Sequence, residues 1–304
     1  GRKMTANYGT FIEGCADVFG QYSPMQGLHI ASPNYFPEFY RYAQPDQILM
    51  LNSEGGHRDD RFPDISPTLF LLGIRDSNLI QKRILGVREA VKDVLYTSRF
   101  RSTKGLGPLP DKFEARVFES PTPGLFALPL VDRRAYSAQL VENPPGQFVD
   151  DYVADPTLLA QNQPVTVSLD SAIYPSLAQV AHAYWYSDEQ PRVELPLERT
   201  GTEVSVKIPV TPAFVSCLIL SRKAIGDLEI KLPTSVRPHD KARILVAGDG
   251  KPIAGARVFF GDTQATTGKD GIAAMAVGGY EGTYVVRAEA SGFFSKRAFC
   301  PVHP

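Results

Sequence analysis

Short segments in which apolar and polar residues alternate constrain the fold of this chain more than any other feature. Residues 113–118, 165–169 and 204–208 alternate with a period of two and are separated by prolines and glycines. This period turns one side of each segment towards a core and the other towards solvent, which is typical of antiparallel strands. With 25 glycines and 25 prolines available for turns, the pattern predicts an antiparallel β-sandwich over residues 111–222.

Residues 223–304 repeat the alternation as a unit of their own, after a hinge near Lys223. The sequence predicts four strands here, over residues 243–247, 256–260, 271–275 and 283–287. The turns between them contain Gly and Asp, which readily adopt the positive φ angles of hairpin turns. We therefore expect a second, smaller antiparallel β-sandwich.

Residues 1–110 carry mixed signals. The apolar stretches 27–30 and 47–52 each end in polar residues and predict buried strands. Residues 76–99 predict a helix, because apolar side chains recur at spacings of three and four while Lys and Arg occupy the opposite face. Further along, residues 144–163 contain Pro and Gly and predict a long loop.

The charge balance and the cysteines exclude several classes of function. The chain has 32 Lys and Arg against 33 Asp and Glu, and no window is strongly basic, so we expect no nucleic-acid binding. No apolar run approaches the ~20 residues of a membrane helix. The spacing of Cys15, Cys217 and Cys300 predicts neither a disulfide framework nor a zinc site, and we expect no metal and no cofactor. The start Gly1-Arg2-Lys3 does not resemble a signal peptide.

The C-terminal unit resembles the carboxypeptidase-regulatory-like, or transthyretin-like, β-sandwich family. Four ordered motifs carry the resemblance: residues 250–258, 265–271, 282–288 and the pair Gly292-Phe293. The resemblance implies a non-catalytic appendage. The turn Asp270-Gly271 is interpreted as a hairpin turn and not as a calcium ligand.

The layout of the preceding residues resembles the C-terminal end of a glycoside-hydrolase-type protein, in which a TIM barrel is followed by a β-sandwich. The order of the segments 11–19, 35–42 and 45–48, the helix and the sandwich carries this resemblance. It implies a fold class of α/β plus all-β: a partial (β/α) barrel-like segment over 1–110, followed by two antiparallel β-sandwiches over 111–222 and 223–304. A full barrel needs about 250 residues, so we expect the chain to be part of a longer protein, or else residues 1–110 to form a different α/β structure.

The resemblance implies two catalytic carboxyl groups at the ends of barrel strands. Glu13 and Asp17 follow one apolar segment and Glu54 follows another, so these three are the candidate catalytic residues. The alternative for each is a solvated loop acid or a helix N-cap.

Four residues are candidates for substrate binding. His57 and Arg58 lie in a polar cluster after two glycines and would hold sugar hydroxyls or a carboxylate, although a surface loop is the alternative. His29 is a candidate base or, alternatively, a core histidine. Trp185 lies in a Tyr-Trp-Tyr run. Successive side chains of a strand point to opposite faces, so at least one ring is expected to face outward and stack on a sugar.

Together these features predict the C-terminal part of a secreted or cell-surface carbohydrate-active protein, related to glycoside hydrolases and inactive on its own. Its expected partner is an oligo- or polysaccharide, without a membrane span, and its oligomeric state stays open. The alternatives are a non-enzymatic carbohydrate-binding or adhesion module, and a structural spacer.

Overall fold

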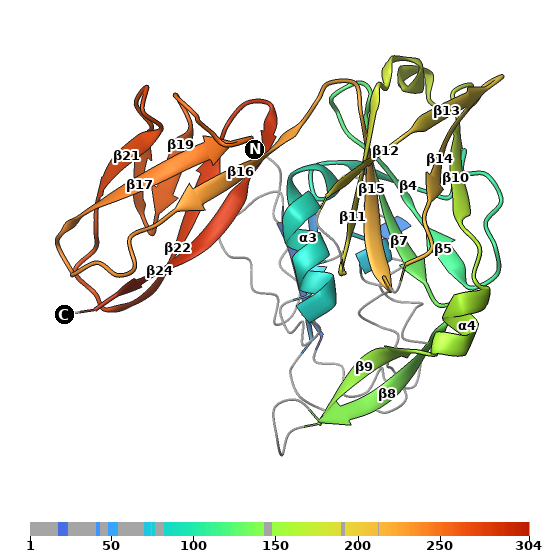
Figure 1. Cartoon of the computed structure of the whole chain (residues 1–304), viewed down its shortest axis with the longest axis horizontal. Helices are drawn as coiled ribbons and strands as arrows, with labels where there is room; N and C mark the ends of the chain where they lie inside the picture. The colour runs from blue at the N-terminus through green and yellow to red at the C-terminus, as the bar shows by residue number, and fades with distance from the viewer. Residues whose placement is uncertain are drawn as a thin grey trace. The chain divides into compact units, whose positions relative to one another are not determined.

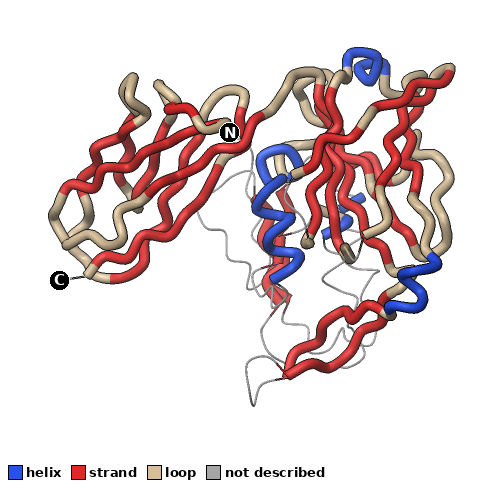
Figure 2. Tube along the Cα trace, in the orientation of Figure 1, coloured by secondary structure: helices blue, strands red, loops and turns tan. Residues whose placement is uncertain are grey.

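The structure, a computed structural model, is mostly β, and most of its strand pairs are antiparallel (Figures 1 and 2). It describes residues 18–23, 41–42, 48–53, 70–73, 75–76, 82–142, 148–189, 192–211 and 213–303. The chain divides into two compact units, Gly1–Arg222 and Lys223–Pro304.

A seven-stranded antiparallel sheet forms the centre of the first unit. In spatial order its strands are β12 (Val193–Leu195), β11 (His182–Ser187), β15 (Val215–Ser221), β7 (Leu125–Asp132), β6 (Val117–Glu119) and β4 (Arg99–Ser102), with β5 (Phe113–Ala115) also paired to β7. Every residue of β15 is buried, so both faces of this central strand are covered.

A smaller sheet covers one face. It contains β10 (Val165–Asp170), β14 (Glu203–Ile208) and β13 (Leu197–Thr200). Alternate residues of β14, such as Val204 and Val206, share a core with Leu218 of β15 and Leu128 of β7. The two sheets therefore form a sandwich, and the predicted strands 165–169 and 204–208 are confirmed.

Helix α3 (Lys82–Leu95) covers the other face and contacts β15, β7 and β11 (Figure 1). Ile84, Val87, Val91 and Val94 are buried at spacings of three and four, which is the apolar stripe that the sequence predicted. The predicted bounds were too wide, because Asp76 belongs to strand β3 (Arg75–Asp76) and β4 begins at Arg99.

The remaining elements of the first unit are short. They are a parallel sheet of β1 (Val18–Ser23), β2 (Ile48–Ser53) and β3, the antiparallel pair β8 (Tyr136–Glu142) and β9 (Phe148–Ala154), helix α4 (Pro156–Gln161) and the 3-10 helix η2 (Pro175–Gln179). The predicted loop over 144–163 is wrong, because β9 and α4 lie within it. Asp155 caps α4 by accepting hydrogen bonds from the N–H groups of Thr157 and Leu158.

The expected fold class, with a partial (β/α) barrel-like segment, is also wrong. The described residues form a mostly β structure with several antiparallel sheets, too few helices for a (β/α) segment, and no barrel. The physical reason lies in α3, whose apolar stripe packs on the antiparallel strands β7, β11 and β15 and not on a parallel barrel.

The second unit is a sandwich of two sheets. One contains β18 (Lys251–Pro252), β17 (Lys241–Gly248), β16 (Gly226–Lys231) and β23 (Phe293–Phe294), with β21 (Ile272–Ala276) also paired to β17; the other contains β20 (Thr263–Thr266), β19 (Arg257–Phe260), β22 (Gly282–Glu289) and β24 (Lys296–Val302). The four strands predicted here correspond to β17, β19, β21 and β22. Ile244, Val258, Val286 and Cys300 lie in the core between the sheets.

Shortening a buried side chain of β15 tests the central place of this strand in the first unit. Leu218→Ala should lower the free energy of unfolding of that unit by about 2–5 kcal/mol, because Leu218 is fully buried and its loss leaves a cavity. Urea denaturation followed by the fluorescence of Trp185, the chain's one tryptophan, measures this. Leu158→Ala is the control, since Leu158 is 45% exposed on α4, and its effect should stay within about 0.5 kcal/mol. Equal effects of the two variants would contradict the assignment.

A buried hydroxyl offers a test specific to the second unit. The Thr267 hydroxyl accepts a hydrogen bond from the Ala256 N–H at 2.9 Å and donates one to the Ile253 carbonyl at 2.6 Å. Thr267→Val should destabilise this unit by about 1–3 kcal/mol, because a buried N–H loses its acceptor. Far-UV circular dichroism should show the shift while the Trp185 fluorescence transition stays in place. The neighbouring exposed Thr266→Val serves as the control, and a shift in the Trp185 transition would argue against this account.

Candidate functional site

Most of the residues predicted to form a site lie outside the described residues. These are the candidate carboxylates Glu13, Asp17 and Glu54, and the candidate substrate-binding residues His29, His57 and Arg58. They stay sequence-based predictions.

Trp185 is described, and its position differs from the expectation. It is only 1% exposed and belongs to the core between the two sheets of the first unit. Tyr184 and Tyr186 on the same strand are also buried, and the guanidinium of Arg192 lies 5.0 Å from the centre of the Tyr184 ring. The expected outward ring does not exist, because α3 covers the face of β11 that alternation alone leaves open.

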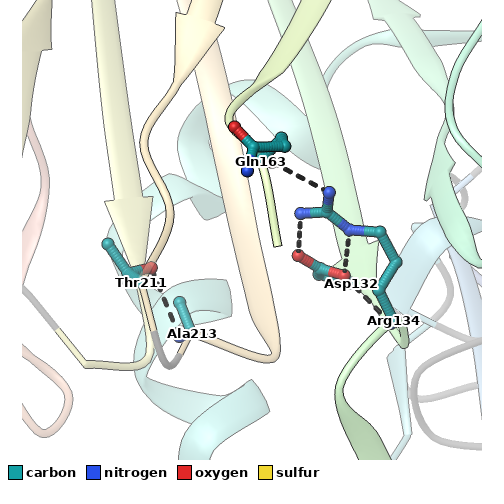
Figure 3. Close-up of polar contacts among 5 residues, drawn as sticks. All are labelled: Asp132, Arg134, Gln163, Thr211 and Ala213. Atoms are coloured by element: carbon teal, nitrogen blue, oxygen red, sulfur yellow. Dashed lines mark hydrogen bonds and ion pairs between the residues drawn. The ribbon is translucent and has the colours of Figure 1, made fainter. Parts of the chain in front are cut away.

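In the described part of the first unit, one polar cluster is centred on Arg134 (Figure 3). Its Nε and Nη2 donate to the two oxygens of Asp132 at 2.9 and 2.7 Å, and its Nη1 donates to the Gln163 carbonyl at 2.9 Å. Its guanidinium also lies 5.4 Å from the centre of the Phe113 ring. Since Asp132 and Arg134 are each 15% exposed and bonded to each other, we interpret this cluster as structural.

Neither metal chemistry nor a reactive thiol has support in the described residues. They contain no group of three or more His, Cys, Asp or Glu side chains able to hold a metal ion. Cys217 and Cys300 are buried free thiols. Burial raises the pKa of both, which keeps them in the unreactive thiol form.

The outer face of the sheet β20-β19-β22-β24 carries a different set of side chains. Alternation turns Val258 and Val286 towards the core and sends their neighbours to the other side. This outer face, which we call the aromatic–arginine face, is formed by Arg257, Phe259, Gln264, Thr266, Thr283, Val285, Arg287, Glu289, Arg297, Phe299 and Pro301.

Strand register arranges this face in rows. Phe259 of β19 lies opposite Arg287 of β22, and Arg287 lies opposite Arg297 of β24. In the next row Val285 lies opposite Phe299. Neighbouring rows are roughly 7 Å apart along a strand and neighbouring strands about 4.8 Å apart, so aromatic rings and guanidinium groups lie close together on this face.

Glu289 organises the charged end of the face. Its carboxylate accepts from Nη2 of Arg257 at 2.5 Å and lies 3.2 Å from Nη1 of Arg287. The guanidinium carbon of Arg287 lies 4.3 Å from the centre of the Phe259 ring, a cation–π contact. These contacts hold two guanidinium groups in defined positions beside an aromatic ring.

Phe299 is the most exposed side chain of the face among the large hydrophobic residues, at 68%, and Val285 opposite it is 44% exposed. Exposed apolar side chains gathered on a flat surface and bordered by polar groups are typical of interaction sites. We therefore take the aromatic–arginine face as the candidate site.

Sequence reasoning missed this site, although part of the signal was present. The predicted strand 256–260 places Arg257 and Phe259 on one side. Because Phe259 and Phe260 are adjacent and both aromatic, the sequence does not show which ring faces outward. Strand β24 is not among the predicted strands; Pro301 lies within it, and proline disfavours strands. Proline is tolerated here because β24 is an edge strand.

Removal of the Arg134 guanidinium tests whether the Asp132 cluster is structural. Arg134→Met should lower the free energy of unfolding of the first unit by about 1–3 kcal/mol, because the largely buried Asp132 carboxylate loses its charged partner. Urea titration followed by Trp185 fluorescence gives the value. The control is Arg222→Met, since Arg222 is exposed and bonds the Gln179 side chain at the surface. An unchanged midpoint for Arg134→Met would show that the cluster does not stabilise the fold.

Within the described residues, no helix has the length and apolarity to span a bilayer. No protein-family model matches the chain, and no curated protein matches it. The two resemblances inferred from its motifs and layout therefore stay predictions.

Proposed function

We propose that this chain is a non-enzymatic carbohydrate-binding protein whose binding surface is the aromatic–arginine face of the second unit. The observation that carries the proposal is the exposed ring of Phe299, 68% accessible, in a row next to paired arginines. Flat aromatic rings cover the apolar face of a sugar ring, and guanidinium groups donate hydrogen bonds in a planar fork to its oxygens.

The geometry suits an extended ligand better than a small molecule. The face is the outer surface of a four-stranded sheet, and its aromatic residues lie on two different strands, Phe259 on β19 and Phe299 on β24. A sugar chain lying across the strands would contact the ring of Phe299 and the guanidinium of Arg287 that lies over the Phe259 ring, while a small molecule is normally held in a concave pocket. A protein that binds polysaccharide would act outside the cell or at its surface, and that localisation is part of the proposal.

We do not extend the proposal to hydrolysis. That expectation depended on a partial barrel, which is wrong for the described residues, and on Glu13, Asp17 and Glu54, which lie outside them. Release of reducing sugars from any polysaccharide by the purified chain would contradict the non-enzymatic assignment.

Removal of the exposed ring tests the binding surface. Phe299→Ala should weaken binding about tenfold for any polysaccharide that binds the parent chain, because a stacked ring contributes of the order of 1.4 kcal/mol. Affinity electrophoresis against a panel of soluble polysaccharides measures this, and the exposure of Phe299 means that the melting temperature should change little.

Tyr280→Ala is the matched control. Tyr280 is 81% exposed in the same unit but lies in the loop between β21 and β22, away from the strand positions of the face. It should bind like the parent chain. Equal losses of affinity in the two variants, or full affinity in Phe299→Ala, would place the binding surface elsewhere. If no polysaccharide binds the parent chain, the proposal is refuted.

A further inference from the structure

Strand β20 forms one edge of the sheet β20-β19-β22-β24, and its backbone groups have a defined direction. Thr267 follows the strand directly. Its N–H donates to the Ala256 carbonyl, and its carbonyl accepts from the Gly255 N–H, so both groups of Thr267 point towards the β19 side. Backbone groups alternate in direction along a strand. The N–H and C=O groups of Gln264 and Thr266 therefore point away from β19, to the outside of the sheet.

This outer edge of β20 is open in the described part of the chain. Among the described residues, no backbone group bonds to Gln264 or Thr266 on that side, and both residues are exposed. Strand β21 comes near β20, and the bond between them uses a side chain: the Thr263 hydroxyl donates to the Ala276 carbonyl at 3.2 Å. Open N–H and C=O groups at a sheet edge are a template for a further strand.

The sequence of β20 does nothing to block this edge. The strand reads Thr-Gln-Ala-Thr and contains neither a charge nor a proline. Natural sheets commonly protect open edges with lysine, proline or other charged side chains. Strand β24, at the other edge of the same sheet, contains Lys296, Arg297 and Pro301. The contrast indicates that β20 is the edge available for pairing.

The open edge is complementary to a second copy of itself. In an antiparallel pair with Ala265 opposite Ala265 of the second copy, Gln264 of each copy lies opposite Thr266 of the other. Both of these pairs can exchange their outward N–H···O=C bonds. A two-fold axis perpendicular to the sheet relates the copies, which is the isologous arrangement of most dimers.

The charges beside the strand suit the same arrangement. Asp262 precedes β20 and Lys269 lies in the turn that follows it, and both are exposed. The two-fold axis brings Asp262 of one copy towards Lys269 of the other. The neighbouring Asp270 is turned into its own loop, where its carboxylate accepts from the Ile272 N–H at 3.1 Å. Opposite charges at the two ends of the edge favour this antiparallel register.

We propose that a second copy of this chain pairs with β20, so that the two four-stranded sheets form one continuous sheet in a dimer. The paired edge is short, because β20 contains only residues Thr263–Thr266. Small interfaces of this kind are weak and transient, so we expect a dissociation constant of the order of 100 µM.

The dimer has a consequence for the aromatic–arginine face. A two-fold axis perpendicular to the sheet keeps the outer faces of both copies on the same side. The two Phe299 rings are then about seven strand spacings, or roughly 34 Å, apart across the strands. A single polysaccharide would contact both faces and gain avidity. This consequence rests on the proposed function, whereas the dimer itself does not.

Sedimentation equilibrium of the full chain without sugar tests the dimer. The dimer fraction should rise between about 10 and 500 µM, a range that spans the expected dissociation constant. Gln264→Pro should weaken association at least about tenfold, because proline removes the outward N–H. Its fold should persist, since proline is tolerated at the outer side of an edge strand, and circular dichroism checks this.

Gln264→Ala is the matched control. It removes the same side chain and keeps the N–H, so it should associate like the parent chain. A chain that stays monomeric over the whole range overturns the proposal and leaves the proposed function untouched, because no sugar is present. A dimer that Gln264→Pro does not weaken, or that Gln264→Ala weakens equally, would also overturn it, since backbone pairing at β20 would not hold the copies together.

Hydrogen exchange of the parent chain locates the interface without any variant. The amide protons of Gln264 and Thr266 should exchange more slowly as the protein concentration rises, measured by NMR, while the amide of Phe299 on the other edge should not change. Slowing at Phe299 alone would place the dimer at β24 and overturn the proposal. A monomer in which Gln264 slows only when an extended peptide such as a synthetic Thr-Val repeat is added would assign the edge to a peptide partner, and would overturn it too.

Discussion

The first unit depends on the burial of strand β15 on both faces. The strand runs Val215–Ser221 with every residue buried, and it pairs with β11 on one side and β7 on the other. A strand with two apolar faces is stable only if both are removed from water. The three-stranded sheet covers one face and α3 the other, so the helix belongs to the same layered structure as strands more than a hundred residues away in sequence.

The same constraint explains why the first unit offers few candidate binding groups in its described part. The side chains of its aromatic run Tyr184-Trp185-Tyr186 are buried, since one side of β11 faces the small sheet and the other faces α3. In the second unit only one face of the sheet β20-β19-β22-β24 meets the core. Its other face leaves the ring of Phe299 and the side chains of Arg257 and Arg297 exposed.

Period-two alternation predicted strands well wherever one face alone is buried. Val204, Val206 and Ile208 of β14 turn inward while their neighbours turn outward. The alternation in the sequence therefore predicts which residues are buried. The pattern says nothing about partners. It could not show that the apolar stripe of α3 packs on β7 and β15, because these strands are distant from the helix in sequence. The analogy to a barrel supplied a wrong partner for the helix.

The candidate site was harder to predict than the strands for the same reason. Glu13, Asp17 and Glu54 are candidates only by analogy to a barrel, whereas the aromatic–arginine face arises from register between the four strands of one sheet. Arg257 is near Glu289 only because β19 and β22 pair antiparallel, and Phe299 faces Val285 only because β24 joins the edge. Pairing register is a tertiary property, and a single sequence does not contain it in readable form.

The arginine pair at the centre of the face has a thermodynamic consequence. Opposed like charges such as Arg287 and Arg297 destabilise an antiparallel pair locally, whereas a domain of about 80 residues has a total stability of roughly 4–12 kcal/mol. The second unit can therefore tolerate the pair without unfolding. Glu289 and the ring of Phe259 lie beside Arg287 and offset part of the cost, so contacts within the fold account for the position of this arginine.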